Sequence, residues 1–98
     1  MKNKDVVLAF LKKEEAWGSN LYSTGKRLIS YATTIAEWYD DYYLLVNHTR
    51  YSVTTSKHQS YLRSELVNNS NIIELCLNDI DINTHDLINI YESNKRGI

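Results

Sequence analysis

The chain has 98 residues, of which 43% are hydrophobic, and a formal net charge of −1. This length suits one domain with one core and excludes a deep, elaborate active site. The single Cys76 excludes an internal disulfide and indicates a reducing, cytoplasmic compartment, and no apolar run approaches the roughly 20 residues of a membrane span. We therefore expect one small cytoplasmic domain over residues 1–98, with residues 93–98 frayed.

The first predicted element is a short amphipathic helix over residues 4–13. Apolar pairs at residues 6–7 and 10–11 stand one helical turn apart, and two lysines near its end suit the helix macrodipole. Residues 14–20 follow as a predicted loop because they contain the turn-forming run Gly18-Ser19-Asn20.

Residues 21–51 predict a three-stranded antiparallel sheet made of two hairpins. The strands are expected at residues 21–23, 26–39 and 42–51, where β-branched and aromatic residues dominate, with turn pairs Thr24-Gly25 and Asp40-Asp41 between them. On the long middle strand, strict alternation places Thr34 with Ala36 on one face and Ile35 with Glu37 on the other. This predicts small residues under a packed helix and an opposite surface lined by tyrosines.

Ser56-Lys57-His58-Gln59 has the sequence of a capping box. In that motif the Ser56 hydroxyl accepts a hydrogen bond from the N–H of Gln59, and the Gln59 amide bonds back to the N–H of Ser56. The motif predicts a helix that begins at Ser56 and ends at the polar run 68–71. Ser56→Ala is accordingly predicted to cost about 0.5 to 2 kcal/mol.

The final third predicts at least one more helix. Residues 72–77 fit either a short strand or a helical turn, because brief apolar runs are ambiguous. Thr84 is a candidate cap for a last helix with Leu87, Ile88 and Tyr91 on its apolar face. The predicted order is helix, three strands, then two or three helices, which is an α+β fold.

Catalytic and metal-binding patterns are weak. Ser56 and His58 stand two apart at a predicted helix start and therefore point in different directions. The histidines at 48, 58 and 85 are scattered, Cys76 stands alone, and no glycine-rich phosphate loop is present. We expect no catalytic residue, no metal and no cofactor, and hence a protein that is not an enzyme.

Charge is distributed unevenly, which raises nucleic-acid binding as one hypothesis. There is no acid from Tyr42 to Ser64, whereas the charged residues from Glu65 to Glu92 are all acidic. The candidate contacts for nucleic acid are Arg50, Lys57, His58 and Arg63, interleaved with tyrosines. The balanced total charge opposes this interpretation; the alternative is a solvated helix face, with Arg50 pairing Glu37 across the hairpin.

Protein recognition is the leading hypothesis. Eight tyrosines and two tryptophans in 98 residues could supply amphipathic anchors for a partner. The candidate protein-binding residues are Tyr43, Tyr51 and His48, on the tyrosine-lined sheet and the loop from His48 to Gln59. The alternative is that these rings only form the core of a small domain.

Four segments resemble small uncharacterised proteins encoded by phages, prophages and plasmids. They are residues 5–11 (DVVLAFL), 20–25 (NLYSTG), 29–36 (ISYATTIA) and 47–59 (NHTRYSVTTSKHQ). The resemblance implies an accessory protein that acts in a bacterial host by binding a host macromolecule, with inhibitors of host defence, including anti-CRISPR proteins, as the model. It implies a host defence or nucleic-acid-processing protein as the partner.

Overall fold

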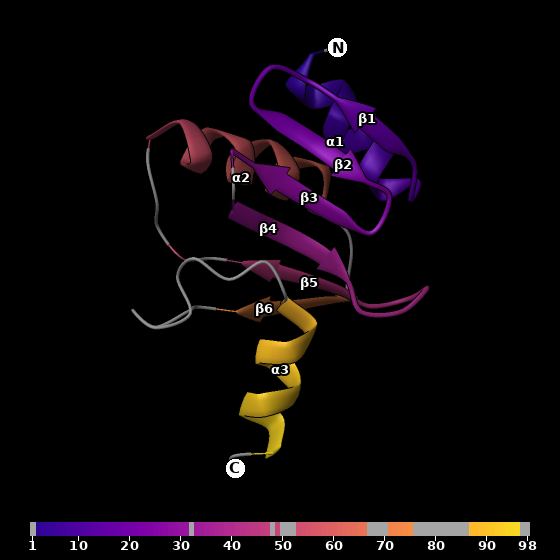
Figure 1. The fold of residues 1–98 in the computed structure, drawn as a ribbon, viewed down its shortest axis with the longest axis vertical. Coiled ribbons are helices and arrows are strands. Elements are labelled where there is room, and N and C mark those ends of the chain that lie inside the picture. Colours follow the sequence, from indigo (N-terminus) through magenta and orange to yellow (C-terminus); the bar gives the residue numbers. More distant parts are fainter. Residues whose placement is uncertain are drawn as a thin grey trace.

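The computed structural model describes residues 2–31, 33–47, 49, 53–66, 71–75 and 87–96, with side chains through residue 92. Its elements in chain order are α1 (Asn3–Leu11), β1 (Glu15–Trp17), β2 (Leu21–Thr24), β3 (Arg27–Ser30), β4 (Thr33–Trp38), β5 (Leu44–Asn47), α2 (Val53–Glu65), β6 (Ile72–Leu75) and α3 (Leu87–Arg96) (Figure 1). The α+β class and the N-terminal helix are confirmed. No helix in these ranges is long and apolar enough to cross a membrane.

The described strands form one six-stranded mixed sheet in the order β1-β2-β3-β4-β5-β6. The first five strands pair antiparallel, and β6 lies parallel to β5 because α2 carries the chain back across the sheet. The prediction of three antiparallel strands is therefore wrong. Residues 15–17, predicted as loop, form an edge strand on β2. Of the ambiguous run 72–77, residues 72–75 form a strand and the other two lie outside the described residues.

The predicted middle strand is two strands joined by a tight turn after Ser30. Tyr31 has a φ of 56°, and Ser30 pairs with Thr33 across the turn. Positive φ is typical of two-residue hairpin turns but uncommon for a residue with a side chain, so a tyrosine here does not indicate a turn. The turn leaves the Tyr31 ring half-exposed.

A β-bulge explains why strict alternation fails along β4. Leu28 pairs with Ala36 and Ile29 with Thr34, which leaves Ile35 as the extra residue. Ile35 and Ala36 consequently enter the same core cluster, although alternation placed them on opposite faces. Beyond the bulge, Glu37 and Leu45 pair on the other face of the sheet.

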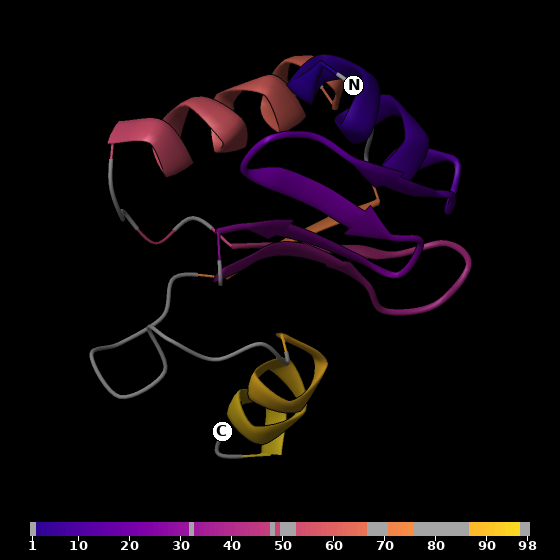
Figure 2. The same ribbon diagram turned by 45° about the horizontal axis from the view of Figure 1, so that its top comes forward.

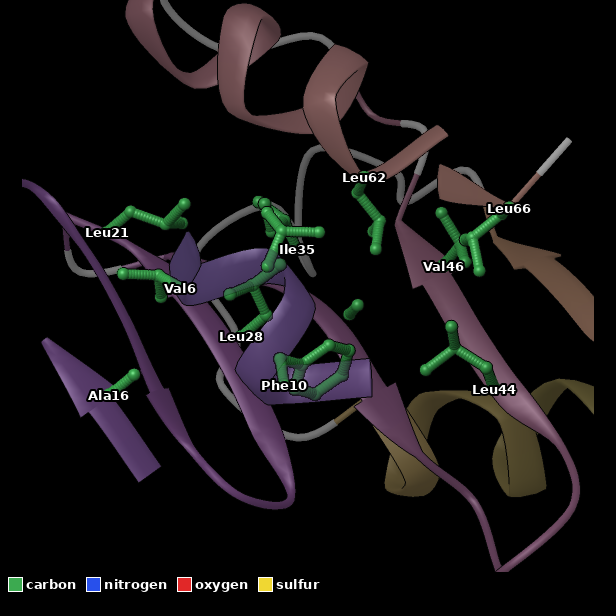
Figure 3. Close-up of a cluster of buried hydrophobic side chains, with 12 residues drawn as sticks. Val6, Phe10, Ala16, Leu21, Leu28, Ile35, Leu44, Val46, Leu62 and Leu66 are labelled. Atoms are coloured by element: carbon green, nitrogen blue, oxygen red, sulfur yellow. The ribbon is translucent and has the colours of Figure 1, made fainter. Parts of the chain in front are cut away.

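The sheet lies between two helical layers: α1 and α2 cover one face, and α3 lies against the other (Figure 2). The α1/α2 face holds a cluster of twelve buried side chains, most of them labelled in Figure 3. Phe10 and Leu62 reach this cluster from the two helices, and Ala16 and Ala36 are small residues beneath them. Of the small residues predicted to lie under a packed helix, Ala36 lies in this cluster, whereas Ala16 comes from a segment predicted as a loop.

The capping box at Ser56 is not formed, because α2 begins three residues earlier, at Val53. Ser56 lies within the first turn of the helix. The Gln59 amide does not bond back to it; its Nε2 donates to the carbonyl oxygens of Asn47, at 2.8 Å, and Thr49, at 3.0 Å. Gln59 therefore ties α2 to the end of β5. Thr84, the predicted cap of the last helix, lies outside the described residues, and α3 continues to Arg96.

Candidate functional site

The structure describes four of the seven predicted binding residues. Tyr43 is described, but the other two candidate protein contacts, His48 and Tyr51, lie outside the described ranges. Of the candidate nucleic-acid contacts, Arg50 also lies outside them, and Lys57, His58 and Arg63 are all on α2. The described candidates therefore occupy two places, the β4–β5 hairpin and α2.

Tyr43 lies at the tip of the β4–β5 hairpin beside a second exposed ring, that of Tyr42. The two ring centroids are 4.9 Å apart in a T-shaped arrangement, with 57% of Tyr42 and 42% of Tyr43 exposed. Asp40 fixes the backbone beneath them, since its Oδ1 accepts hydrogen bonds from the N–H groups of Tyr42 and Tyr43, each at 2.7 Å. Those bonds, first from Tyr43 and then from Tyr42, lower the pKa of the Asp40 carboxyl.

Trp38 anchors this hairpin to α1. Its indole Nε1 donates to the carbonyl oxygen of Phe10 at 3.1 Å, and the Lys13 ammonium lies 4.0 Å from the centre of the Trp38 ring. Lys13 also donates to the carbonyl of Asp41 at 3.3 Å. A pocket of about 210 Å³ opens here. These contacts give Tyr42 and Tyr43 a fixed base.

His58 is buried, with 1% of its surface exposed, between α1, α2 and β3. Its Nδ1 lies 2.7 Å from Ser30 Oγ, and its Nε2 lies 3.2 Å from Asn3 Nδ2. The Ser30 hydroxyl also contacts Thr55 Oγ1 at 3.1 Å. Burial lowers the pKa of His58 and therefore favours the neutral ring. The ring of His58 is therefore not exposed for contact with nucleic acid, the role predicted from the sequence.

The tautomer of His58 decides what the Ser30–His58 pair can do. With the Asn3 amide nitrogen as donor, Nε2 is the acceptor, so Nδ1–H donates to Ser30 and the Ser30 hydroxyl donates to Thr55. In this arrangement the imidazole donates a hydrogen bond to the serine oxygen and accepts none from it, so it cannot act as a base toward Ser30, which is fully buried. The network connects three elements and presents no activated nucleophile at the surface.

Lys57 and Arg63 do not share a face of α2. At about 100° per residue, six residues separate the two side chains by about 120° around the helix axis. Arg63 lines a pocket of about 220 Å³ with Val46, Leu66, Ile72 and Glu74. Lys57 is exposed and lies one turn from Tyr61. The described basic residues of the predicted segment are thus spread around the helix.

A different basic site, which the sequence did not indicate, lies where α1 begins. A pocket of about 660 Å³ is lined by Lys2, Asn3, Lys4, Ser19 and Tyr61. These residues come from the start of α1, the β1–β2 loop and α2. No local spacing in the sequence links them, so only the packing of α1 against α2 brings them together. Among the described residues there is no group of three His, Cys, Asp or Glu placed to hold a metal ion.

The chain belongs to a family of unknown function, DUF8033, whose family model matches residues 7–81. The match confirms the expected membership of an uncharacterised family. It runs from α1 through β6 and ends before α3. Comparison with curated proteins and with solved structures finds no significant match.

Proposed function

We propose that the chain is a non-enzymatic binding module that recognises a protein partner through the tip of the β4–β5 hairpin. The observation that carries this proposal is the pair of exposed, adjacent rings of Tyr42 and Tyr43 on a backbone fixed by Asp40. Exposed aromatic pairs of this kind are typical anchors of protein interfaces, because each ring offers a large amphipathic surface with few rotatable bonds.

The fixed backbone of the hairpin tip favours a role of the two rings in binding a partner over mere exposure to solvent. Ordering a flexible loop on binding reduces the net affinity, whereas this tip is already held by Asp40 beneath the rings and by Trp38 and Lys13 at its base. Both rings lie outside the two buried clusters of the sheet. The alternative role of core packing, open for any tyrosine in the sequence, therefore does not account for these two.

The identity of the partner rests on the resemblance to proteins of mobile elements. On that basis we propose a host protein in a bacterial cytoplasm, of the defence or nucleic-acid-processing kind, which the chain inhibits as anti-CRISPR proteins do. His48 and Tyr51 stay in the proposal as candidate contacts. Inhibition, phage origin and a cytoplasmic location are further parts of this proposal, and identifying the partner is the first step in testing them.

The experiment is an affinity purification of the tagged chain from a nuclease-treated bacterial lysate, followed by a binding assay with the captured protein. We expect Tyr43→Ala to weaken binding at least about tenfold, with an unchanged melting temperature. Tyr61→Ala is the matched control, since it removes a ring of nearly equal exposure, 41% against 42%, from α2. Equal binding by both variants would contradict the proposal, and a joint loss of binding and stability would assign Tyr43 to packing.

A further inference from the structure

The large pocket beside the start of α1 lies at the opposite end of the strands from the Tyr42–Tyr43 tip. Ser19 precedes β2, whose first residue, Leu21, pairs with Ser30. The β4–β5 hairpin follows the other end of the sheet, where Trp38 pairs with Leu44. A ligand in this pocket would leave the proposed protein-binding tip free, so the two sites can be tested separately.

The charged groups that line the pocket are all positive. Lys2 and Lys4 supply two ammonium groups, and none of its lining residues is acidic. The pocket also adjoins the N-terminus of α1, a nine-residue helix whose cap residue, Lys2, makes no capping bond with its own side chain. The first N–H groups of a helix carry partial positive charge, which adds to the field of the lysines, and Asp5 in the first turn offsets part of that field without lining the pocket. The site therefore favours an anion.

Tyr61 adds an aromatic surface to this field. Tyr61 is 41% exposed and lines the pocket, and Lys57 lies one helical turn before it on the same side of α2. Lysines that neutralise phosphates, together with an open aromatic ring on which a base can stack, are the elements of sites for single-stranded nucleic acid. The pocket is a broad, open depression, which suits a strand crossing the surface better than an enclosed small molecule.

The buried His58 network holds the pocket residues in place. Asn3, the first residue of α1, both lines the pocket and donates to His58 Nε2 at 3.2 Å. His58 is in turn bonded to Ser30 at 2.7 Å. Lys2 and Lys4 are the chain neighbours of Asn3, so the Asn3–His58 hydrogen bond also restrains the backbone of the two lysines. This restraint reduces the conformational entropy that these residues would lose on binding a ligand.

We propose that this pocket binds single-stranded nucleic acid, with phosphates at Lys2 and Lys4 and a base stacked on Tyr61. Lys57 extends the basic track along α2. Of the contacts predicted from sequence, the site keeps Lys57 and replaces the buried His58 and the divergent Arg63 with residues from the start of the chain. The proposal is independent of the protein-binding function.

The test is fluorescence anisotropy of a labelled thymidine oligonucleotide about 20 nucleotides long, titrated with the full chain at about 50 to 200 mM salt. Two or three lysine–phosphate contacts predict a slope of log K against log salt of about −1.4 to −2. We expect Lys4→Glu to weaken binding about tenfold and to reduce the magnitude of the slope by about 0.7. Tyr61→Ala should also cost about tenfold, and Tyr61→Phe, which keeps the ring, should bind as the wild type does.

Lys12→Glu is the matched control, because it makes the same charge change at the other end of α1, where Lys12 is the C-cap residue. Equal losses for Lys4→Glu and Lys12→Glu would overturn the site, since the effect would then come from overall charge. Absence of binding by the wild type at low salt would overturn it as well. Equal affinity for duplex DNA, or no effect of Tyr61→Ala, would overturn the assignment to a single strand. Tyr43→Ala should bind the oligonucleotide normally even if the protein-binding proposal fails.

Discussion

The two faces of the sheet are covered in different ways. On one face, α1 and α2 share twelve buried apolar residues with five strands. On the other, α3 contributes Leu87 and Ile90 to a buried cluster completed by Leu45 and Leu75. Polar contacts supplement this smaller cluster: the N–H of Leu87 donates to Glu37 Oε1 at 2.8 Å, and the Tyr39 hydroxyl donates to Glu92.

The difference indicates which parts of the molecule unfold together. A continuous apolar cluster loses most of its free energy if any one element leaves it, whereas a small cluster with a few polar ties can open locally. The family match covers the sheet and most of the α1/α2 layer and ends before α3. We therefore expect α1, α2 and the sheet to unfold as one unit and α3 to be separable from it.

The largest effect should come from Phe10→Ala. Phe10 is fully buried between α1 and the sheet, and its ring lies 5.8 Å from that of Trp38. Removing a buried phenylalanine ring costs about 3 to 5 kcal/mol of unfolding free energy. Chemical denaturation monitored by circular dichroism measures the loss, and Leu8→Ala, at a half-exposed position of the same helix, is the control. Similar losses for both variants would contradict a continuous core on this face.

Glu37→Gln should have a smaller and more local effect. The Glu37 side chain is fully buried, with Oε1 on the first N–H of α3 and Oε2 at 3.2 Å from Arg27 Nε. The amide keeps an acceptor for the helix but loses the charge that favours a helix N-terminus and the ion pair. Because Arg27 is one-third exposed and can be solvated, we expect a loss of about 1 to 2 kcal/mol.

Hydrogen exchange distinguishes local from global loss in the Glu37→Gln variant. Amides of α3 should exchange faster than in the wild type, while those of α1 should change little, because the carboxylate binds α3 on the face of the sheet opposite the α1/α2 cluster. Glu15→Gln, at an exposed position of β1, is the control for loss of one negative charge. Uniformly faster exchange across the chain would show that the two faces are a single cooperative unit.

The pH dependence of stability should report the polar contacts inside the α1/α2 layer. Burial lowers the pKa of His58 below its ordinary value of 6.5, so the folded state binds the proton less readily than the unfolded state does. The stabilising contribution of neutral His58 is fully present above about pH 6.5 and is lost as the pH falls from there through the pKa of the folded state. His58→Gln should therefore show a flatter decline in melting temperature between about pH 7.5 and pH 5. Parallel declines for both proteins would assign the sensitivity to other groups.

Sequence periodicity predicted those features of the fold that depend on residues close together in the chain. The buried Val6, Val7 and Phe10 confirm the helical spacing at the N-terminus. The edge strand at 15–17 was missed because only Ala16 of its three residues is buried, which leaves too little alternation to recognise. The turn at Tyr31 and the bulge at Ile35 were not predicted, because tyrosine and isoleucine are not residue types that indicate a turn or a bulge.

The surroundings of the candidate site residues could not be predicted from the sequence for a different reason, which is distance along the chain. His58 was predicted to lie on a polar surface, but its hydrogen-bond partners Asn3 and Ser30 are 55 and 28 residues away in the sequence. The pocket at the start of α1 likewise joins Lys2 and Lys4 to Tyr61 only through helix packing. Tyr43 was selected from composition, and its exposure and fixed backbone are features of the folded hairpin.

Ser56→Ala should have the smallest effect, and it separates the capping-box prediction from the structure. As an N-cap, Ser56 would cost about 0.5 to 2 kcal/mol when replaced. As the fourth residue of α2 it has no capping role, and alanine is the better helix former, so we expect a change within about 0.5 kcal/mol in either direction. Thr55→Ala is the matched comparison, because Thr55 is buried and bonded to Ser30 and its loss leaves a buried hydroxyl with one partner fewer. A larger loss for Ser56 than for Thr55, measured by thermal denaturation, would mean that α2 begins where the sequence motif placed it.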